Sequence, residues 1–172
     1  MSIITNKEKA LLAIKRSGYE LQHASKELQN DKEVVLAAIK KNGYALYYAS
    51  KELQNNKEVV LIAVKEDSFA VQHASKELQN NKEIVLEAVK KNGFALQYAS
   101  EELQNDKEIV LAAIQQEEYS LKFASEELQN QIGDNAPIII LKELIQIEKE
   151  KIVLESKINS KENINKLIKV KI

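Results

Sequence analysis

Apolar and polar positions along this chain follow a pattern that returns every 25 residues. The segment ASKELQN occupies residues 24–30, 49–55 and 74–80, and ASEELQN occupies residues 99–105 and 124–130. Self-similarity with a period of roughly 20 to 50 residues is the sequence signature of stacked structural units. We therefore divide the first part of the chain, residues 1–129, into five units: 5–29, 30–54, 55–79, 80–104 and 105–129.

The second unit shows the first element that we expect in every repeat. Asn30, followed three residues later by Glu33, is a capping-box signature, so a helix is predicted over about 31–41. The apolar residues of this segment cover a little more than half of the circumference of an α-helix. They are Val34, Val35, Leu36, Ala38 and Ile39.

The remainder of the unit predicts a tight turn and a second, shorter helix. Asn42 and Gly43 are expected to form a left-handed stop, and residues 44–49 the short helix. Ser50 is expected to cap a last turn in which Leu53 points inward. The recurring heptapeptide is thus interpreted as the joint between units, whose geometry has to be the same each time.

Departures from the pattern predict how the ends and the middle of the array differ. Lys9 stands where later units have an apolar residue such as Val34, so we expect this slot to face the preceding unit. The fifth unit has two glutamates at 117–118 in place of Asn-Gly, and terminal units are often atypical. The third unit has Asp-Ser at 67–68, where we expect a looser or differently angled turn.

A single unit of this size cannot bury its own apolar faces, whereas stacked units can. The sequence therefore predicts an all-α fold. We expect a right-handed α-solenoid of five 25-residue helix-turn-short-helix repeats, followed by a C-terminal capping helix or helical hairpin.

Residues 130–172 lie outside the period. Pro137 marks the first turn of a helix predicted to run to about Ile158, and a last short helix is predicted to start at Ser160. Two roles stay open for this segment: a cap over the fifth unit, and self-association or partner binding through residues 137–158. We favour the cap, because repeat arrays need caps and the apolar stripe is wider than a strict coiled-coil seam. The stripe comprises Ile140, Leu144, Ile147, Leu154 and Ile158, flanked by Leu141, Ile145 and Ile152.

Composition narrows the class of protein. The 172 residues include 25 Lys and Arg and 26 Asp and Glu, so we expect no general attraction to nucleic acid or acidic membranes. The chain has no cysteine, which rules out disulfides and thiolate sites and suits a reducing compartment. No segment resembles a signal peptide, and the apolar run 136–141 is too short to span a membrane. We therefore expect a cytoplasmic protein.

A search for catalytic or metal-binding residues finds no constellation. His23 and His73 occupy the same slot of two units, about 20 Å apart by the spacing of packed helices, and cannot share a metal ion. Other units place Tyr48, Tyr98 and Phe123 in this slot, which indicates aromatic packing. We therefore predict no catalytic residue, no cofactor, no metal and no small-molecule substrate.

The recurring carboxylates are given structural roles. We interpret one set as capping-box partners of the long helices: Glu33, Glu58, Glu83 and Glu108. We interpret a second set, inside the joint, as local turn or cap partners: Glu52, Glu77 and Glu102.

Positions expected on the outer surface are the candidates for binding. One slot of the long helix reads Leu12, Ala37, Ile62, Glu87 and Ala112, and one slot of the short helix reads Gln22, Tyr47, Gln72, Gln97 and Lys122. Apolar and aromatic residues in such slots are candidate partner contacts, since aromatic anchors are enriched at interaction hot spots, although isolated exposed apolar residues are also normal. We select Leu12, Tyr47, Ile62, Glu87 and Gln97.

A basic ladder adds further candidates at the ends of the long helices. It comprises Lys15-Arg16, Lys40-Lys41, Lys65 and Lys90-Lys91. The ladder is a candidate binding site for an acidic protein or a phosphate backbone. The alternative is a purely structural role, because cations at helix C-termini complement the helix dipole. We include Lys40, Lys41, Lys90 and Lys91 as candidate partner contacts. Nucleic acid is disfavoured by the near-zero net charge and by the carboxylates in every unit.

The repeat resembles a known family. The segment EVVLAAIKKNGYALYYASKELQNNKEVVLIAV, residues 33–64, is similar to the consensus of domain of unknown function 4116, and the resemblance covers residues 5–129. Family members often carry Pro after the serine of the joint, where this chain has Lys26, Lys51, Lys76, Glu101 and Glu126. The resemblance implies helical repeats of intracellular bacteria, protists and large DNA viruses, and leaves open an effector in a host cytosol. It supplies no catalytic residues.

These observations favour a non-enzymatic helical-repeat scaffold that mediates protein–protein interaction. A structural protein that self-associates through the C-terminal helix is the second hypothesis. Nucleic-acid binding through the basic ladder is the third and weakest.

Overall fold

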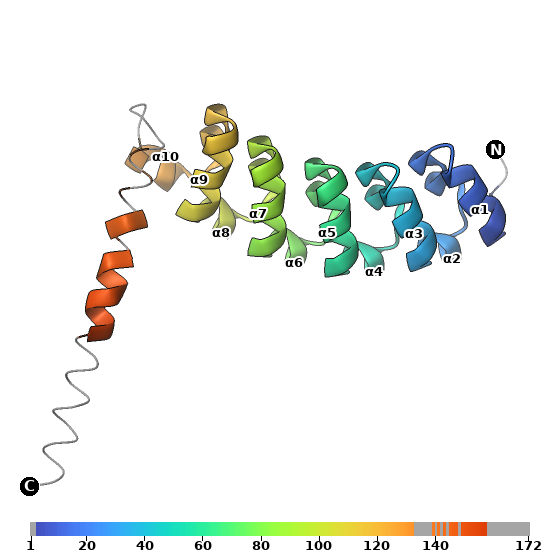
Figure 1. Ribbon diagram of the computed structural model, residues 1–172, viewed down its shortest axis with the longest axis horizontal. Helices are drawn as coiled ribbons and strands as arrows, with labels where there is room; N and C mark the ends of the chain where they lie inside the picture. Colours follow the sequence, from blue (N-terminus) through green and yellow to red (C-terminus); the bar gives the residue numbers. More distant parts are fainter. Residues whose placement is uncertain are drawn as a thin grey trace, which may run out of the picture.

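The computed structural model is all-α in the part of the chain that it describes, residues 3–132, 139, 141, 143, 145–147 and 149–157. Its units stand side by side in one row that follows the order of the sequence (Figure 1). No strand occurs among the described residues, where a single parallel bridge joins Ile4 to Ala24. The all-α repeat architecture is thus confirmed, whereas the right-handed sense of the array stays a prediction.

Each of the five units contains three elements in the same order. The long helices are α1 (Lys7–Ile14), α3 (Lys32–Ile39), α5 (Lys57–Glu66), α7 (Lys82–Lys91) and α9 (Lys107–Gln116). Each is followed by a 3-10 helix: η1 (Gly18–His23), η2 (Gly43–Tyr48), η3 (Ser68–His73), η4 (Gly93–Tyr98) and η5 (Glu118–Phe123). Each unit ends in a short helix: α2 (Lys26–Gln29), α4 (Lys51–Gln54), α6 (Lys76–Gln79), α8 (Glu101–Gln104) and α10 (Glu126–Ile132).

The cap of the long helix was predicted one residue too early. Asp31, and not Asn30, is the N-cap of α3, and its Oδ1 accepts from the backbone N–H groups of Glu33 and Val34 at 3.0 and 3.2 Å. Asn30 ends the preceding short helix. Its side chain contacts Ser50 and Glu52 in the next joint, which explains why asparagine recurs there without capping the long helix.

The Asn-Gly pair does not form a left-handed stop, so this prediction was wrong. Asn42 has extended backbone, with φ −160° and ψ 114°, and its Oδ1 accepts from the N–H of Tyr44 at 2.9 Å. Asn42 is therefore the N-cap of the second helix, which is a 3-10 helix over Gly43–Tyr48 rather than the predicted 44–49. Glycine is required for a close approach instead: a Cβ added to Gly43 would lie 2.6 Å from the carbonyl oxygen of Ala63 in the next unit.

The third unit does not have the looser turn that we expected. Asp67 has φ −139° and ψ 114°, and it caps η3 by accepting from the N–H of Phe69 at 2.9 Å. The third unit differs at the glycine position, where Ser68 brings a Cβ that is buried.

The short turn of the joint was predicted correctly. Ser50 caps α4 by accepting from the backbone N–H of Leu53 at 3.2 Å, and the Leu53 side chain is buried. The N–H of Ser50 also donates to the carbonyl of Gln29 in the preceding unit at 2.9 Å. In the first unit, Ile4 takes the role of Gln29, because its carbonyl accepts from the N–H of Ser25 at 2.8 Å.

One continuous core runs through the row of units. The slot that holds Lys9 in the first unit is fully buried in the later units, where it holds Val34, Val59, Ile84 and Ile109, whereas Lys9 itself is exposed. Long helices of adjacent units contact each other along the whole row. Both observations agree with the expectation that this slot faces the preceding unit.

The tail meets the repeats near its start. The described residues between 139 and 157 are helical, which agrees with the predicted helix, and this helix leads away from the row (Figure 1). Leu141 is fully buried and joins the core, whereas Ile139, Ile147 and Leu154 are exposed. Parts of the prediction that concern residues 133–138, the end at Ile158 and the helix from Ser160 lie outside the described residues. Within the described part, no helix is both long and apolar enough to cross a bilayer.

Candidate interaction surface

Aromatic rings form a ladder between adjacent units. Each contact joins the first aromatic residue of a 3-10 helix to the last residue of the next one, with ring centroids 4.7 to 6.5 Å apart. The pairs are Tyr19–Tyr48, Tyr44–His73, Phe69–Tyr98 and Phe94–Phe123. Edge-on pairs of this kind contribute about 0.5–1.5 kcal/mol beyond area burial. The predicted packing role of the histidine slot is thereby confirmed at His73.

The ladder widens into a cluster in the first three units, which we call the tyrosine surface: Tyr19, Tyr44, Tyr47, Tyr48 and His73. Tyr47 lies 5.6 Å from Tyr44, 5.1 Å from Tyr48 and 5.0 Å from His73 between ring centroids. It nevertheless leaves 53% of its area in solvent, and Tyr19 is also exposed. The neighbouring rings hold Tyr47 in place while its outer side stays open, which is the arrangement of a preformed anchor.

His73 packs against Tyr44 and Tyr47, with ring centroids 4.7 and 5.0 Å away. Its Nε2 is buried and has no hydrogen-bond partner among the described residues. Burial lowers the pKa of His73 below its usual value, because the charged imidazolium would lose its hydration. The imidazole is therefore neutral near pH 7. The part of the chain that the structure describes holds no group of three metal-ligating side chains.

A groove of about 750 Å³ lies beside Tyr47, between the joints of units one and two. Its walls combine tyrosine rings with long polar side chains: Gln22, Lys26, Gln29, Tyr47, Tyr48, Ala49, Ser50, Lys51 and Gln54. Lys51 Nζ donates to Gln54 Oε1 at 2.9 Å, and Gln54 Nε2 donates to the carbonyls of Leu46 and Tyr47 at 3.1 Å. Hydrogen bonds of Gln54 thus connect this side of the groove to η2.

The charge of the joint changes along the array. The first position of the short helix is lysine in units one to three and glutamate in units four and five: Lys26, Lys51, Lys76, Glu101 and Glu126. All five are exposed. The tyrosine surface therefore lies on the half of the array that carries the joint lysines.

A ladder of asparagines connects consecutive joints, and we call it the asparagine ladder: Asn30, Asn55, Asn80 and Asn105. Asn80 shows the pattern: its Nδ2 donates to Glu102 Oε2 at 2.9 Å, and its Oδ1 accepts from the hydroxyl of Ser100. The joint carboxylates thus have a partner in the preceding joint that we had not predicted, as Glu52 accepts from Asn30 at 3.1 Å. The predicted local role is seen in the first joint, where Glu27 is hydrogen-bonded to Ser25 of its own turn.

Replacing Asn80 with alanine is expected to lower the free energy of unfolding by about 1 kcal/mol, because both hydrogen bonds to the next joint are lost at a solvent-exposed site. Urea unfolding followed by circular dichroism measures the change. Asn130 is the matched control: it occupies the same position of the fifth joint, 124–130, which is the last copy of the heptapeptide in the sequence. An Asn130→Ala change as large as that of Asn80→Ala would contradict a linking role for the ladder.

Lysines at the start of the long helices pair with the next unit. Lys7, Lys32, Lys57 and Lys82 lie 2.5 to 2.9 Å from Glu33, Glu58, Glu83 and Glu108 respectively. These glutamates are therefore partners in ion pairs between units, and the prediction that they act through a capping box was wrong. Lys7 also donates to Asp31, which holds the pKa of that carboxyl below its usual range.

The candidate residues of the long helices lie apart from the tyrosine surface. Leu12 and Glu87 are exposed, whereas Ile62 is half-buried and packs against the core. None of these three lines the groove beside Tyr47. Of the candidates on the 3-10 helices, Gln97 is exposed and donates to the carbonyl of Phe94 at 3.0 Å.

The candidate lysines are all exposed, and one of them serves a neighbouring helix. Lys91 Nζ donates to the carbonyls of Lys65 and Glu66 at the end of α5, the latter at 2.8 Å. Lys91 therefore interacts with the C-terminus of a helix, which is the structural role that we gave above as the alternative to partner binding. Lys40, Lys41 and Lys90 have exposed side chains.

Sequence reasoning missed most of the residues that surround Tyr47. Tyr19 was given no role, and Lys26 and Lys51 were named only as deviations from a consensus. The available signal was the period itself, because aromatic residues in equivalent slots of adjacent units have to meet once the units stack.

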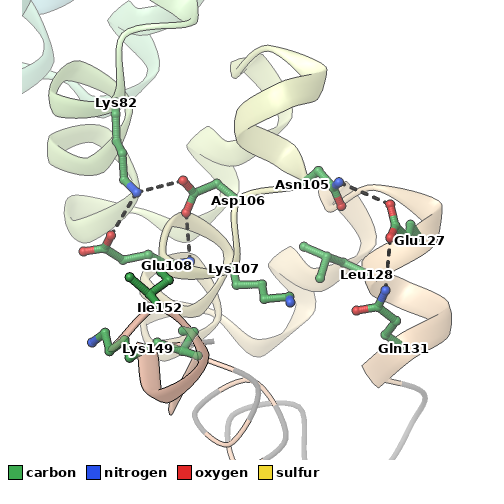
Figure 2. A pocket seen from close by; sticks show the side chains of 11 residues that line it. Lys82, Asn105, Asp106, Lys107, Glu108, Glu127, Leu128, Gln131, Lys149 and Ile152 are labelled. Carbon is green, nitrogen blue, oxygen red and sulfur yellow. Dashed lines mark hydrogen bonds and ion pairs between the residues drawn. The ribbon is translucent and has the colours of Figure 1, made fainter. Parts of the chain in front are cut away.

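A second pocket, of about 490 Å³, lies where the tail helix passes the fourth and fifth units (Figure 2). Lys82 spans its wall and pairs with Asp106 and Glu108 at 2.7 and 2.9 Å. Leu128, Ile145 and Ile152 supply apolar walls. The charged groups near Lys82 are already paired, so this pocket offers an incoming ligand less than the groove beside Tyr47.

Comparison with known proteins identifies the repeat. The model of the family described as domain of unknown function (DUF4116) matches four overlapping segments, residues 6–54, 31–79, 56–104 and 81–129. Each match spans two consecutive units, and together the matches cover well over half of the chain. No curated protein and no solved structure matches it. The tandem matches and the repeated helices agree, and the chain belongs to the DUF4116 family.

Proposed function

We propose that this chain is a non-enzymatic helical-repeat scaffold that binds another protein through the tyrosine surface and the adjoining groove. One observation supports the proposal most directly: Tyr47 is held by three neighbouring rings and yet exposes 53% of its area. A rigid, half-exposed tyrosine buries a large area on binding and loses little conformational entropy, and tyrosine is enriched among interaction hot spots.

The groove beside Tyr47 supports the proposal further. It offers an apolar wall formed by Tyr47 and Tyr48 together with the cationic heads of Lys26 and Lys51. An apolar centre with a polar rim is the usual anatomy of a protein interface. The surface therefore fits a protein segment that carries an apolar side chain and hydrogen-bond acceptors or carboxylates beside it.

Replacing Tyr47 with alanine is expected to raise the dissociation constant of the partner by about 30-fold or more, the loss of a hot-spot residue. The full chain is first used to capture partners from cell lysate, and the captured protein is then purified and titrated by calorimetry. Circular dichroism verifies that the variant stays folded.

Tyr119 provides the matched control. It is the fifth-unit equivalent of Tyr19 and Tyr44, it is 81% exposed, and it lies outside the tyrosine surface. Tyr119→Ala is expected to bind the partner normally. The proposal fails if Tyr47→Ala and Tyr19→Ala both bind as tightly as the unmodified chain, or if Tyr119→Ala weakens binding as much as they do.

A further inference from the structure

Three lysines of consecutive joints are held in the same way, and we call them the lysine row: Lys26, Lys51 and Lys76. Each Nζ donates to the side-chain oxygen of the glutamine three residues later, at 2.9 to 3.0 Å. That glutamine is buried in all three joints, and its amide donates in turn to a backbone carbonyl of the preceding 3-10 helix. The fold therefore positions the three ammonium groups, although the lysine side chains are exposed.

The positive charge of the lysine row is not neutralised within the described part of the chain. The ion pairs found there involve lysines of the long helices and none of the lysine row. Glu52 and Glu77, the neighbours of the second and third lysines, accept hydrogen bonds from asparagines of the preceding joint. The groove beside Tyr47 is lined by the first two lysines of the row and by no acidic residue. This groove is therefore complementary to carboxylates.

The spacing of the lysine row matches an extended chain. Backbone hydrogen bonds of 2.9 Å join consecutive joints, from Ser50 to the carbonyl of Gln29 and from Ser75 to the carbonyl of Gln54. Adjacent packed helices lie about 8–10 Å apart, so the lysines repeat at about that distance. A polyproline II helix has three residues per turn, so every third side chain lies on one side, about 9.3 Å from the last.

We infer, on the basis of the proposed function, that the bound segment is an acidic stretch of another protein in the polyproline II conformation. It carries a carboxylate at every third residue, and each carboxylate meets one lysine of the row. Aromatic-lined grooves are the usual sites for polyproline II segments, and Tyr47 and Tyr48 line this groove. Glutamate takes the lysine position in the last two joints, so the acidic stretch covers the first three units only.

Fluorescence anisotropy of a labelled nine-residue peptide, titrated with the full chain, tests the inference. The peptide has glutamate at its first, fourth and seventh positions, leucine at its fifth and proline elsewhere, because a residue before proline favours the polyproline II conformation. It is expected to bind about tenfold more tightly than the same peptide with glutamine in place of glutamate. Added salt is expected to remove this difference, because it screens exposed charges.

Two double variants with the same net charge separate the lysine row from general electrostatics. Lys26→Glu combined with Lys51→Glu is expected to weaken binding of the glutamate peptide about tenfold or more. Lys9→Glu combined with Lys151→Glu is the control, because both lysines are exposed and neither lines the groove. This control is expected to bind the peptide normally, and circular dichroism verifies that both variants stay folded.

A gain of affinity provides a second test. Glu101→Lys extends the lysine row by one joint, and it is expected to tighten binding of a twelve-residue peptide with a fourth glutamate about threefold. The effect on the nine-residue peptide is expected to be smaller. An equal effect on both peptides would refute the pairing of one carboxylate with each joint.

The inference is overturned if the glutamate peptide does not bind, if the glutamine peptide binds as tightly, or if the Lys9 and Lys151 control weakens binding as much as the lysine-row variant. Equal binding of a peptide with the same composition but adjacent glutamates would overturn the spacing, and tighter binding of an oligothymidylate of equal charge would overturn the class of partner. A captured partner that needs Tyr47 but binds the lysine-row variant normally would refute the acidic segment alone. The proposed function fails separately, when Tyr47→Ala and Tyr19→Ala leave that partner bound.

Discussion

Replacing Leu46 with alanine is expected to lower the free energy of unfolding by about 2–5 kcal/mol, the usual cost of removing a fully buried leucine side chain. Leu46 lies in η2, is 0% exposed, and belongs to the continuous core. The neighbouring units cannot close the resulting cavity easily, because the hydrogen bonds of the joints and the glycine contacts hold their spacing. Urea unfolding followed by circular dichroism measures the loss.

The position of Leu46 makes the effect larger than a local cavity. In a repeat array each unit is stabilised mainly by its neighbours. Damage in the second unit therefore also weakens the first unit, which among the described residues packs against the second unit alone. Hydrogen exchange is expected to speed up in units one and two before units four and five.

Leu12 is the matched control for Leu46. It is also a leucine within a helix, but it is 58% exposed on α1. Leu12→Ala is expected to change the free energy of unfolding by no more than about 0.5 kcal/mol, as for most surface substitutions. Equal losses for the two variants would contradict the position of the core described above.

Replacing Gly93 with alanine is expected to destabilise the protein by about 1–3 kcal/mol, although alanine normally favours a folded state over glycine. The added Cβ would lie 2.2 Å from the carbonyl oxygen and 3.0 Å from the carbonyl carbon of Ala113 in the next unit. Both atoms belong to the backbone of α9, so η4 and α9 have to move apart. The sign of the change therefore distinguishes packing between units from local backbone preference.

Two other units carry a residue with a Cβ at the position of Gly93. Ser68 carries a Cβ at the equivalent position of the third unit, where it is buried. Glu118 occupies it in the fifth unit, is exposed, and has no sixth unit to meet. Glu118→Ala is thus the control for Gly93→Ala and is expected to be neutral within about 0.5 kcal/mol. An increase in the free energy of unfolding for Gly93→Ala would show that η4 and α9 can move apart without destabilising the protein.

Most of the fold could be predicted from the sequence because the repeat supplies five copies of one local pattern. The apolar slots of the long helix, the serine cap of the joint and the exposed Lys9 all follow from residue type and spacing. Helical periodicity and caps depend on contacts within a few residues, which a sequence displays directly.

Two of the errors concern groups whose partners lie in the neighbouring joint or unit. Asn30 resembles an N-cap, but its amide meets Glu52; Glu33 resembles a capping-box partner, but its carboxylate meets Lys7. A local sequence pattern cannot reveal a partner that is more than twenty residues away. Asparagine and glutamate suit a helix cap as well as a contact with a distant residue, so residue type does not distinguish the two roles.

Five helical units, their order and the residues of the shared core follow from the sequence alone. It also limited the chemistry, since histidines stand only in an aromatic slot and cysteine is absent. The tertiary structure alone decided which surfaces stay open. Stacking brings Tyr19, Tyr44, Tyr47 and His73 together around a groove, and docking of Leu141 leaves Ile147 and Leu154 in solvent. Exposure is a property of what neighbouring elements cover, and that depends on how the units pack.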